Sequence, residues 1–172
     1  MKRHVVLIGL PGSGKTTVGR LVAEQLHAGF VDIDSVLVRR EGKPVTMIFA
    51  ERGEAAFRDL EQKEMTTALG NLPAIIASGG GWAAQPGALA GAKPHALIVY
   101  LRTKPETCAE RAAPEGTRPL LMGEDPVERM RQLSKERDPA YRQADETVDT
   151  ERKSTAAVAS EVVRLAQKVA GW

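Results

Sequence analysis

A glycine-rich segment close to the N-terminus contains residue types that bind phosphate. Residues 9–16, GLPGSGKT, fit the pattern G-x-x-x-x-G-K-S/T. In this pattern the glycines let backbone N–H groups face an anion, the lysine reaches the β- and γ-phosphates, and the hydroxyl ligates Mg²⁺. The segment therefore predicts a site for a nucleoside triphosphate with Mg²⁺. Its expected nucleotide-binding residues are Gly12, Ser13, Gly14, Lys15, Thr16 and Thr17.

The surroundings of this segment fit a phosphate-binding loop. Residues 4–8 form a short run rich in β-branched residues, which is typical of a buried strand. Beyond Lys15, apolar residues recur at helical spacing until Gly29, which is expected to end the helix. A loop that leaves a strand and enters a helix is the context that supports phosphate binding. The alternative, a glycine-rich turn with a solvated lysine, is disfavoured by this context.

Two carboxylates follow at the end of the next predicted strand. In residues 29–34, GFVDID, the alternation places Asp32 and Asp34 on one side of a strand. Ligands of doubly wound sheets bind at the carboxyl ends of the strands, so both carboxylates are expected over one crevice. One of them can hold Mg²⁺ through water while the other accepts a hydrogen bond from a nucleophilic hydroxyl. Alternatively, Asp34 simply caps a helix that begins at Ser35.

Glycines and an arginine further along the chain suit the binding of a second substrate. Gly79, Gly80 and Gly81 follow a third predicted strand, where glycine lets a ligand approach main-chain N–H groups closely. Arg58 lies one helical turn before Glu61. This spacing either orients the guanidinium or forms an exposed ion pair of little consequence.

Two other arginines lie in segments that leave their roles open. Residues 113–125 have no apolar periodicity and predict a mobile lid, in which Arg118 can move onto the transferring phosphate. Arg137 is expected to close a helix that starts near Asp125, where a cation also simply favours the helix dipole. Spacing alone does not decide between these roles.

Alternating strands and helices must position all of these residues. Further strands are expected at 73–78, 95–101 and 146–150, and helices at 35–41, 44–69, 126–137 and 154–170. A bend is expected at Gly53, and a capping box at Thr103 and Glu106. The alternation predicts an α/β fold with a parallel sheet and helices on both faces. Since no linker or repeat interrupts it, residues 1–172 are expected to form one domain.

The composition excludes several classes of protein. The chain has 172 residues, of which 42% are hydrophobic and 27% charged, as in a globular domain. A net charge of +2 is too small to indicate a nucleic-acid or membrane partner. The single cysteine, Cys108, excludes an internal disulfide and fits a reducing compartment, so a cytoplasmic location is expected.

The absence of two guanine-nucleotide motifs favours a transferase. Regulatory GTPases need an Asp-x-x-Gly element and an Asn-Lys-x-Asp element, and neither string occurs in this sequence. An enzyme that uses ATP as phosphate donor is therefore favoured over a GTPase.

Taken in order along the chain, these segments resemble the shikimate kinase family. The matching strings are GLPGSGKTT, DID, IFAERGEAAFRDLE, SGGG, RPLL and ERDPAY, the last followed by AD and VDT, and together they cover nearly the whole chain. The resemblance implies transfer of the γ-phosphate of ATP to the 3-hydroxyl of shikimate, in the pathway to chorismate and aromatic amino acids. It also implies the P-loop kinase fold with five strands in the order 2-3-1-4-5.

The resemblance further implies how the acceptor is bound, within a region at about 34–61 and by residues beyond it. Asp34 would hydrogen-bond the shikimate hydroxyls and accept the proton. Arg58 and Arg137 would hold the carboxylate, a task that suits their forked donors. Residues 79–81 would bind shikimate through their backbone.

On the nucleotide side, the resemblance implies that Lys15, Mg²⁺ and Arg118 neutralise the transferring phosphate. Lys15, Asp34 and Arg118 would thus be the catalytic residues. Asp32 would join Thr16 around Mg²⁺. The residues that fall where the family packs against adenine are Arg111, Arg152 and Lys153.

Other interpretations remain open. A kinase of another small hydroxy acid, such as gluconate, keeps the loop but does not require Arg58, the glycine triplet and Arg137 together. A nucleoside monophosphate kinase lacks support because its base-reading and lid motifs are missing. An inert nucleotide-binding module is disfavoured by the intact Lys15 and Asp34. The expected partners are ATP and shikimate, and the expected state is a monomer.

Two features fit no assigned role. Trp82 follows the glycines where the family usually has a small residue, and it is expected either to pack against the lid or to narrow the acceptor pocket. Arg39 and Arg40 are expected to form a solvated helix face.

Overall fold

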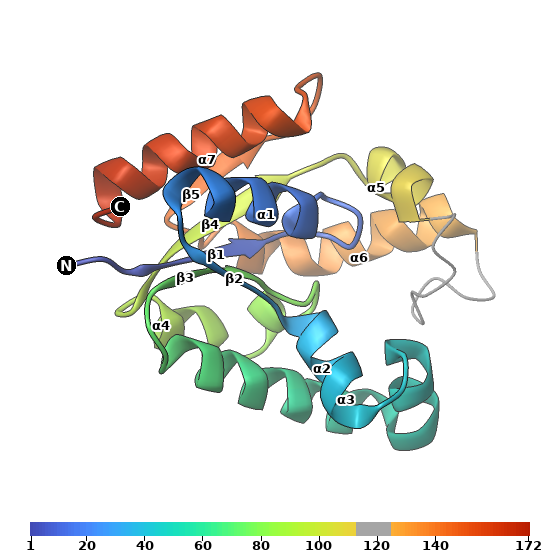
Figure 1. Ribbon diagram of the computed structural model, residues 1–172. Coiled ribbons are helices and arrows are strands. Elements are labelled where there is room, and N and C mark those ends of the chain that lie inside the picture. Colours follow the sequence, from blue (N-terminus) through green and yellow to red (C-terminus); the bar gives the residue numbers. More distant parts are fainter. Residues whose placement is uncertain (113–124) are drawn as a thin grey trace.

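The central sheet determines where the candidate residues lie. The computed structural model describes residues 1–112 and 125–172, and Figure 1 shows their arrangement. Five parallel strands form one sheet in the order β2-β3-β1-β4-β5. The strands are β1 (His4–Ile8), β2 (Gly29–Asp32), β3 (Ala74–Ala77), β4 (Ala96–Arg102) and β5 (Glu146–Asp149). The expected parallel sheet and its strand order are confirmed.

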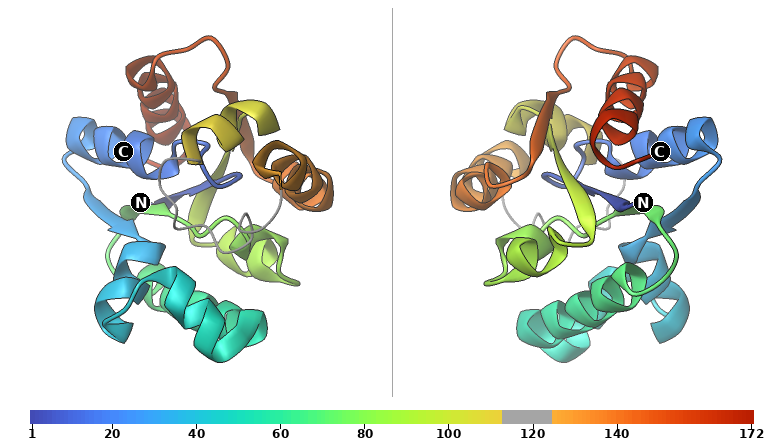
Figure 2. Two further views of the ribbon diagram at one scale, coloured as in Figure 1. Left: turned by 90° about the vertical axis from the view of Figure 1, so that its right-hand side faces the viewer. Right: turned by 90° about the vertical axis from the view of Figure 1, so that its left-hand side faces the viewer.

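Helices cover both faces of the sheet, as the views in Figure 2 show. One face packs against α1 (Lys15–Leu26) and α7 (Thr155–Val169). The opposite face packs against α2 (Ile33–Glu41), α3 (Val45–Leu69), the 3₁₀ turn η1 (Trp82–Ala84), α4 (Ala88–Ala92), α5 (Pro105–Ala112) and α6 (Pro126–Tyr141). In the part of the chain that the structure describes, no helix combines the length and the apolar character needed to cross a membrane.

Strand β1 gives the phosphate-binding loop a fixed starting point. It lies between β3 and β4, and its residues are at most 3% exposed. Val5 and Leu7 face the layer of α1 and α7, whereas Val6 and Ile8 face the opposite layer. Burying one side chain of this size contributes about 1.5–3 kcal/mol. The strand is therefore held firmly from both sides at the point where the loop leaves it.

The strand expected at 29–34 is shorter because a helix begins inside it. β2 ends at Asp32, whose Oδ1 accepts a hydrogen bond from the Ser35 N–H at 3.1 Å. This N-cap interaction starts α2 at Ile33. Asp34 therefore lies in the first turn of α2, and the prediction that Asp32 and Asp34 alternate on one strand was wrong. The residue that caps the helix is Asp32 rather than Asp34.

Helix α6 continues beyond its expected end near Arg137. It includes Pro139 and ends at Tyr141. Arg137 and Tyr141 lie one turn apart on the same face and are both buried, so packing of this face outweighs the hydrogen bond that proline removes. The expected bend at Gly53 of α3 is confirmed, since this residue has a φ of 80° and a ψ of 173°.

The capping box expected at Thr103 and Glu106 does not form, because the helix starts later. α5 begins at Pro105, and the Thr103 hydroxyl lies 2.6 Å from the hydroxyl of Thr150 instead. The same Thr103 hydroxyl donates to the carbonyl oxygen of Ser13 at 3.5 Å. Thr103 thus joins the end of β4 to the phosphate-binding loop and to the residue after β5.

Helix α1 ends at Leu26, because His27 adopts the left-handed conformation with a φ of 50°. The expected terminator, Gly29, is instead the first residue of β2. Left-handed backbone is unfavourable for residues other than glycine, even though glycine loses more entropy on folding. We therefore expect His27→Gly to raise the free energy of unfolding by roughly 0.5–1 kcal/mol. The check is the melting temperature, with His27→Ala as a control that should give no such gain.

Candidate active site

The loop at 9–16 folds tightly onto its neighbours. Gly12 and Gly14 have φ angles of 81° and 97°, a conformation that favours glycine. A Cβ at Gly12 would lie 2.7 Å from the carbonyl oxygen of Cys108 in α5. The loop can therefore keep its shape only if this position has no side chain.

Lys15 supplies the positive charge of the loop. Its side chain is almost completely buried, and its Nζ donates hydrogen bonds to the carbonyl oxygens of Gly9 at 2.7 Å and Leu10 at 2.9 Å. These contacts hold the ammonium group beside the N-terminus of α1. A helix N-terminus attracts anions through its free N–H groups and its dipole, so the charge and the helix act together on a phosphate.

Thr16 and Asp32 provide a pair of oxygen atoms next to this charge. Thr16 Oγ1 donates to Asp32 Oδ2 at 2.5 Å. Mg²⁺ prefers oxygen ligands and usually keeps waters and substrate phosphates in its coordination shell. Among the described residues, no group of three or more His, Cys, Asp or Glu side chains could hold a metal ion. A magnesium ion held by this pair would need phosphate oxygens or water as its other ligands.

A cavity of about 250 Å³ opens above these groups. It brings together most of the residues expected on the nucleotide side and two of those expected on the acceptor side. Its lining consists of Gly12, Gly14, Lys15, Thr16, Thr17, Asp32, Asp34, Ser78, Gly80 and Arg111. Ser78 also lines this cavity and directly precedes the glycine triplet, but its residue type and spacing indicated no role. The Ser78 hydroxyl donates to the carbonyl oxygen of Leu7 at 3.0 Å.

A smaller cavity of about 180 Å³ lies on the other side of the loop. Arg111 lines both cavities, and its Nη1 donates to the carbonyl oxygen of Gly12 at 3.5 Å. The other lining residues are Ser13, Gly14, Thr17, Val18, Thr150, Lys153, Thr155 and Val158. Lys153 also pairs with Glu161 of α7 at 2.9 Å. Thr150 and Thr155 had not been recognised in the sequence, because a lone threonine gives no local signal.

The acceptor side contains a buried ion pair. Arg58 Nη1 lies 3.0 Å from Glu61 Oε1, and the Glu61 side chain is 1% exposed. Burial raises the pKa of Glu61, the nearby Arg58 opposes this change, and the carboxylate of Asp34 adds to it. Arg137, 7% exposed, also acts on Glu61 electrostatically. The pair is therefore buried within a cluster of charges rather than exposed on a helix surface.

Each glycine of the triplet leaves room for one neighbouring side chain. A Cβ at Gly79 would lie 1.8 Å from Glu61 Oε2, and a Cβ at Gly81 would lie 2.5 Å from the Arg58 guanidinium carbon. A Cβ at Gly80 would lie 3.1 Å from Arg137 Nη1. The triplet thus allows three charged side chains to approach the backbone after β3.

Three buried polar atoms have no hydrogen-bond partner within the described ranges, and all belong to these two regions. They are Ser13 Oγ, Arg58 Nε and Glu61 Oε2. Buried polar groups are normally satisfied, and exceptions often have a functional cause. One of them lies in the phosphate-binding loop and two in the charge cluster beside the glycine triplet.

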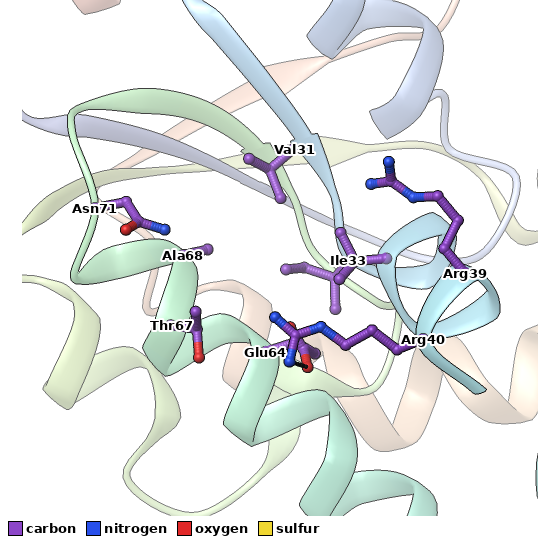
Figure 3. A pocket seen from close by; sticks show the side chains of 9 residues that line it. Val31, Ile33, Arg39, Arg40, Glu64, Thr67, Ala68 and Asn71 are labelled. Atoms are coloured by element: carbon purple, nitrogen blue, oxygen red, sulfur yellow. Dashed lines mark ion pairs between the residues drawn. The ribbon is translucent and has the colours of Figure 1, made fainter.

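Trp82 and Arg40 make contacts that the sequence did not indicate. Trp82 is 1% exposed, packs in the core, and donates from Nε1 to Gln62 Oε1 at 3.0 Å, so it does not narrow the acceptor pocket. Its expected contact with the lid lies outside the described residues. Arg40 pairs with the buried Glu64 at 3.1 Å in a hollow between α2 and α3, away from the candidate site (Figure 3). Arg39 and Arg40 are both exposed, as expected of a solvated helix face, and Arg40 makes this ion pair in addition.

Two predictions concern residues that the structure does not describe. Arg118 and the lid at 113–125, apart from Asp125, lie outside the described residues. Asp125 itself is the N-cap of α6, where its Oδ1 accepts a hydrogen bond from the Val127 N–H at 2.9 Å.

The match to known proteins extends over most of the chain. Residues 11–167 match the family model described as "Shikimate kinase". The chain belongs to the shikimate kinase family. A shikimate kinase of Caldanaerobacter subterraneus subsp. tengcongensis is 38% identical, over 98% of this chain and 99% of that protein. The structure of the shikimate kinase from Acinetobacter baumannii in complex with shikimate matches with a TM-score of 0.93 and 33% identity, over 98% of this chain and 94% of that one.

A more distant structure supports the fold alone. A gluconokinase from Sinorhizobium meliloti matches with a TM-score of 0.63 and 18% identity, over 99% of this chain and 94% of that one. The shikimate kinase family therefore shares its sheet and helices with a kinase named for another acceptor.

The crowding at Gly79 gives a test of the acceptor cluster. Gly79→Ala should displace the Glu61 carboxylate, which is buried and paired with Arg58 and so has little room to move. We expect the free energy of unfolding to fall by roughly 1–3 kcal/mol, as measured by denaturant titration. The control is Gly91→Ala in α4, where a Cβ meets nothing within 4 Å and alanine favours the helix. Equal losses in the two variants would contradict this account of the triplet.

Proposed function

We propose that the chain transfers the γ-phosphate of ATP to the 3-hydroxyl of shikimate, giving shikimate 3-phosphate and ADP. The observation that supports this most directly is that Asp34 and Gly80 line the same cavity as Lys15 and Thr16. An acceptor held by the first pair would therefore lie beside a phosphate held by the second. Membership of the shikimate kinase family, and the similarity to a shikimate kinase solved with shikimate, support the identity of the acceptor.

On the nucleotide side, the loop holds the phosphates and Lys15 neutralises their charge. Thr16 and Asp32 would hold Mg²⁺, which neutralises further charge on the phosphates. Adenine would occupy the smaller cavity, between Arg111 and Lys153. Phosphoryl transfer passes through a loose transition state, so positioning and neutralisation account for most of the catalysis.

On the acceptor side, Arg58 and Arg137 hold the carboxylate of shikimate and Asp34 accepts the proton of its hydroxyl. Guanidinium groups suit this task because their donors pair with both oxygens of a carboxylate. Glu61 holds the guanidinium of Arg58 at 3.0 Å, which fixes its direction. Gly79, Gly80 and Gly81 bind the acid through their backbone.

Several further predictions belong to this proposal. Arg118 would move onto the transferring phosphate with the lid, which would exclude water. We expect Arg118→Ala to lower kcat far more than substrate affinity. The enzyme is expected to act as a monomer in the cytoplasm, on small molecules and without a nucleic-acid or membrane partner.

A panel of acceptors tests the proposal. ADP release should require shikimate and should be absent or much slower with quinate, gluconate or AMP. Lys15→Met should lose at least about a thousandfold in kcat, because the charge on the phosphates is no longer neutralised. Its far-ultraviolet circular dichroism should match that of the wild type. Preferential turnover of gluconate or AMP would refute the proposed acceptor, and near-normal turnover by Lys15→Met would refute the phosphate-binding role.

The raised pKa of Glu61 predicts how acceptor binding depends on pH. Glu61 orients Arg58 only as a carboxylate, and burial raises its pKa above the usual value of glutamate. As the pH falls through this raised pKa, Glu61 gains a proton and the KM for shikimate should increase. The increase should therefore begin at a higher pH than an ordinary glutamate would give.

Glu61→Gln is the control for this pH dependence. This variant should have a higher KM for shikimate at neutral pH than the wild type. As the pH falls, its KM should increase less than that of the wild type, because the contribution of Glu61 is missing. Titration of shikimate itself is common to both proteins. Identical pH profiles of KM in the two proteins would rule out Glu61 as the titrating group.

A further inference from the structure

Tyr141 connects α6 to the glycine triplet. It is the last residue of the helix and is fully buried. Its hydroxyl donates a hydrogen bond to the carbonyl oxygen of Gly80, a residue 61 positions away in the sequence. Its ring packs against Tyr100 of β4, with the ring centroids 5.1 Å apart. The side chain is therefore fixed by packing, and its single polar atom is directed at the acceptor side of the candidate site.

The same hydroxyl also contacts Arg137, one helical turn earlier. The guanidinium of Arg137 lies beside the Gly80 backbone to which this hydroxyl donates, and its positive charge opposes the effect of burial on the pKa of Tyr141. Burial raises the pKa of Tyr141 to about 12, so the hydroxyl keeps its proton near neutral pH and continues to donate to Gly80. One atom thus donates a hydrogen bond to Gly80 and interacts electrostatically with Arg137.

Gly80 is held by other groups as well. If Gly80 had a Cβ, this atom would lie 3.1 Å from Arg137 Nη1 and 3.1 Å from the ring of Pro11 in the phosphate-binding loop. Gly80 also lines the cavity that contains Lys15 and Asp34. The distance between the acceptor and the phosphates therefore depends on where the Gly80 backbone lies.

We propose that Tyr141 is a positioning residue for the acceptor, because its hydroxyl links the Arg137 guanidinium to the Gly80 carbonyl and so fixes two parts of the acceptor site at once. This inference rests on the proposed function of the site. Arginine has a long side chain that loses considerable conformational entropy when it is ordered. A buried partner orders the side chain before the acceptor binds, so less entropy is lost on binding. Without the hydroxyl, Arg137 and Gly80 would each lose a buried partner. Binding of the acceptor would then have to order both residues, which would weaken the binding.

Tyr141→Phe removes only the hydroxyl and keeps the ring. We expect the KM for shikimate to rise about tenfold, while the KM for ATP and kcat stay within about twofold of the wild type. Tyr100→Phe is the matched control, because its ring contacts Tyr141 but its hydroxyl donates to Asp138 at 3.2 Å. This control should leave the KM for shikimate unchanged.

The outcomes separate positioning from a purely structural role. A fall in melting temperature with an unchanged KM for shikimate would overturn the inference, as would an equal rise in KM in Tyr100→Phe. A loss of kcat without a change in KM would also overturn it. The wild type is measured first, and if it does not phosphorylate shikimate, the proposed function fails independently of any result for Tyr141.

A double-mutant cycle with Arg137→Ala tests the link itself. Since Tyr141 acts partly through Arg137, adding Tyr141→Phe to Arg137→Ala should raise the KM for shikimate by less than Tyr141→Phe does alone. If the two increases simply multiply, the two residues act independently and the proposed link is wrong.

Discussion

The buried carboxylate of Glu61 is the constraint around which the acceptor side of this protein is arranged. Removing a charge from water is unfavourable by several kcal/mol unless a partner and hydrogen bonds compensate. Arg58 compensates at 3.0 Å, whereas Asp34 acts in the opposite direction. The guanidinium of Arg58 in turn lies 5.4 Å from the ring centroid of Phe57. These contacts leave the arginine few alternative positions, which is what recognition of a carboxylate requires.

The sheet explains why two sites that are distant in sequence meet. β1 pairs with β3 in parallel register, and the loop that follows β1 and the glycines that follow β3 leave the sheet at the same edge. Loops are flexible unless they are anchored, and here both are held by contacts with α5, α3 and α6. The protein thus combines glycine-rich backbone with side chains that restrict the movement of this backbone.

The sequence predicted which residues of the phosphate-binding loop lie together, because the signal of this loop is local. A single loop between a strand and a helix contains most of the residues, and the structure places them around one cavity. Asp34 was selected for an incorrect reason: it lies in the first turn of α2 and not on a strand, yet it still lines that cavity. The pattern Asp-x-Asp occurs both where the first aspartate caps a helix and where the two aspartates alternate on a strand. The sequence therefore could not distinguish these two structures.

The acceptor side depended more on contacts between distant segments, which periodicity does not reveal. The spacing of Arg58 and Glu61 allowed either an exposed pair or a functional one, and the burial of the pair excludes the exposed one. Tyr141 had no assigned role, because its partner Gly80 lies on another element. Arg137 was expected at a helix end, where it would have been exposed to solvent, but α6 continues through Pro139 and buries it.

The crowding at Gly81 has a consequence for how such proteins diverge. A side chain at this position would occupy the space of the Arg58 guanidinium, 2.5 Å from its central carbon. Residue 81 therefore cannot become larger while Arg58 keeps this position: a lineage that acquires a larger residue at 81 must also shorten or redirect residue 58, and it then loses a cation that could recognise an acid. Among homologues, a residue larger than glycine at 81 should therefore occur together with a change at 58.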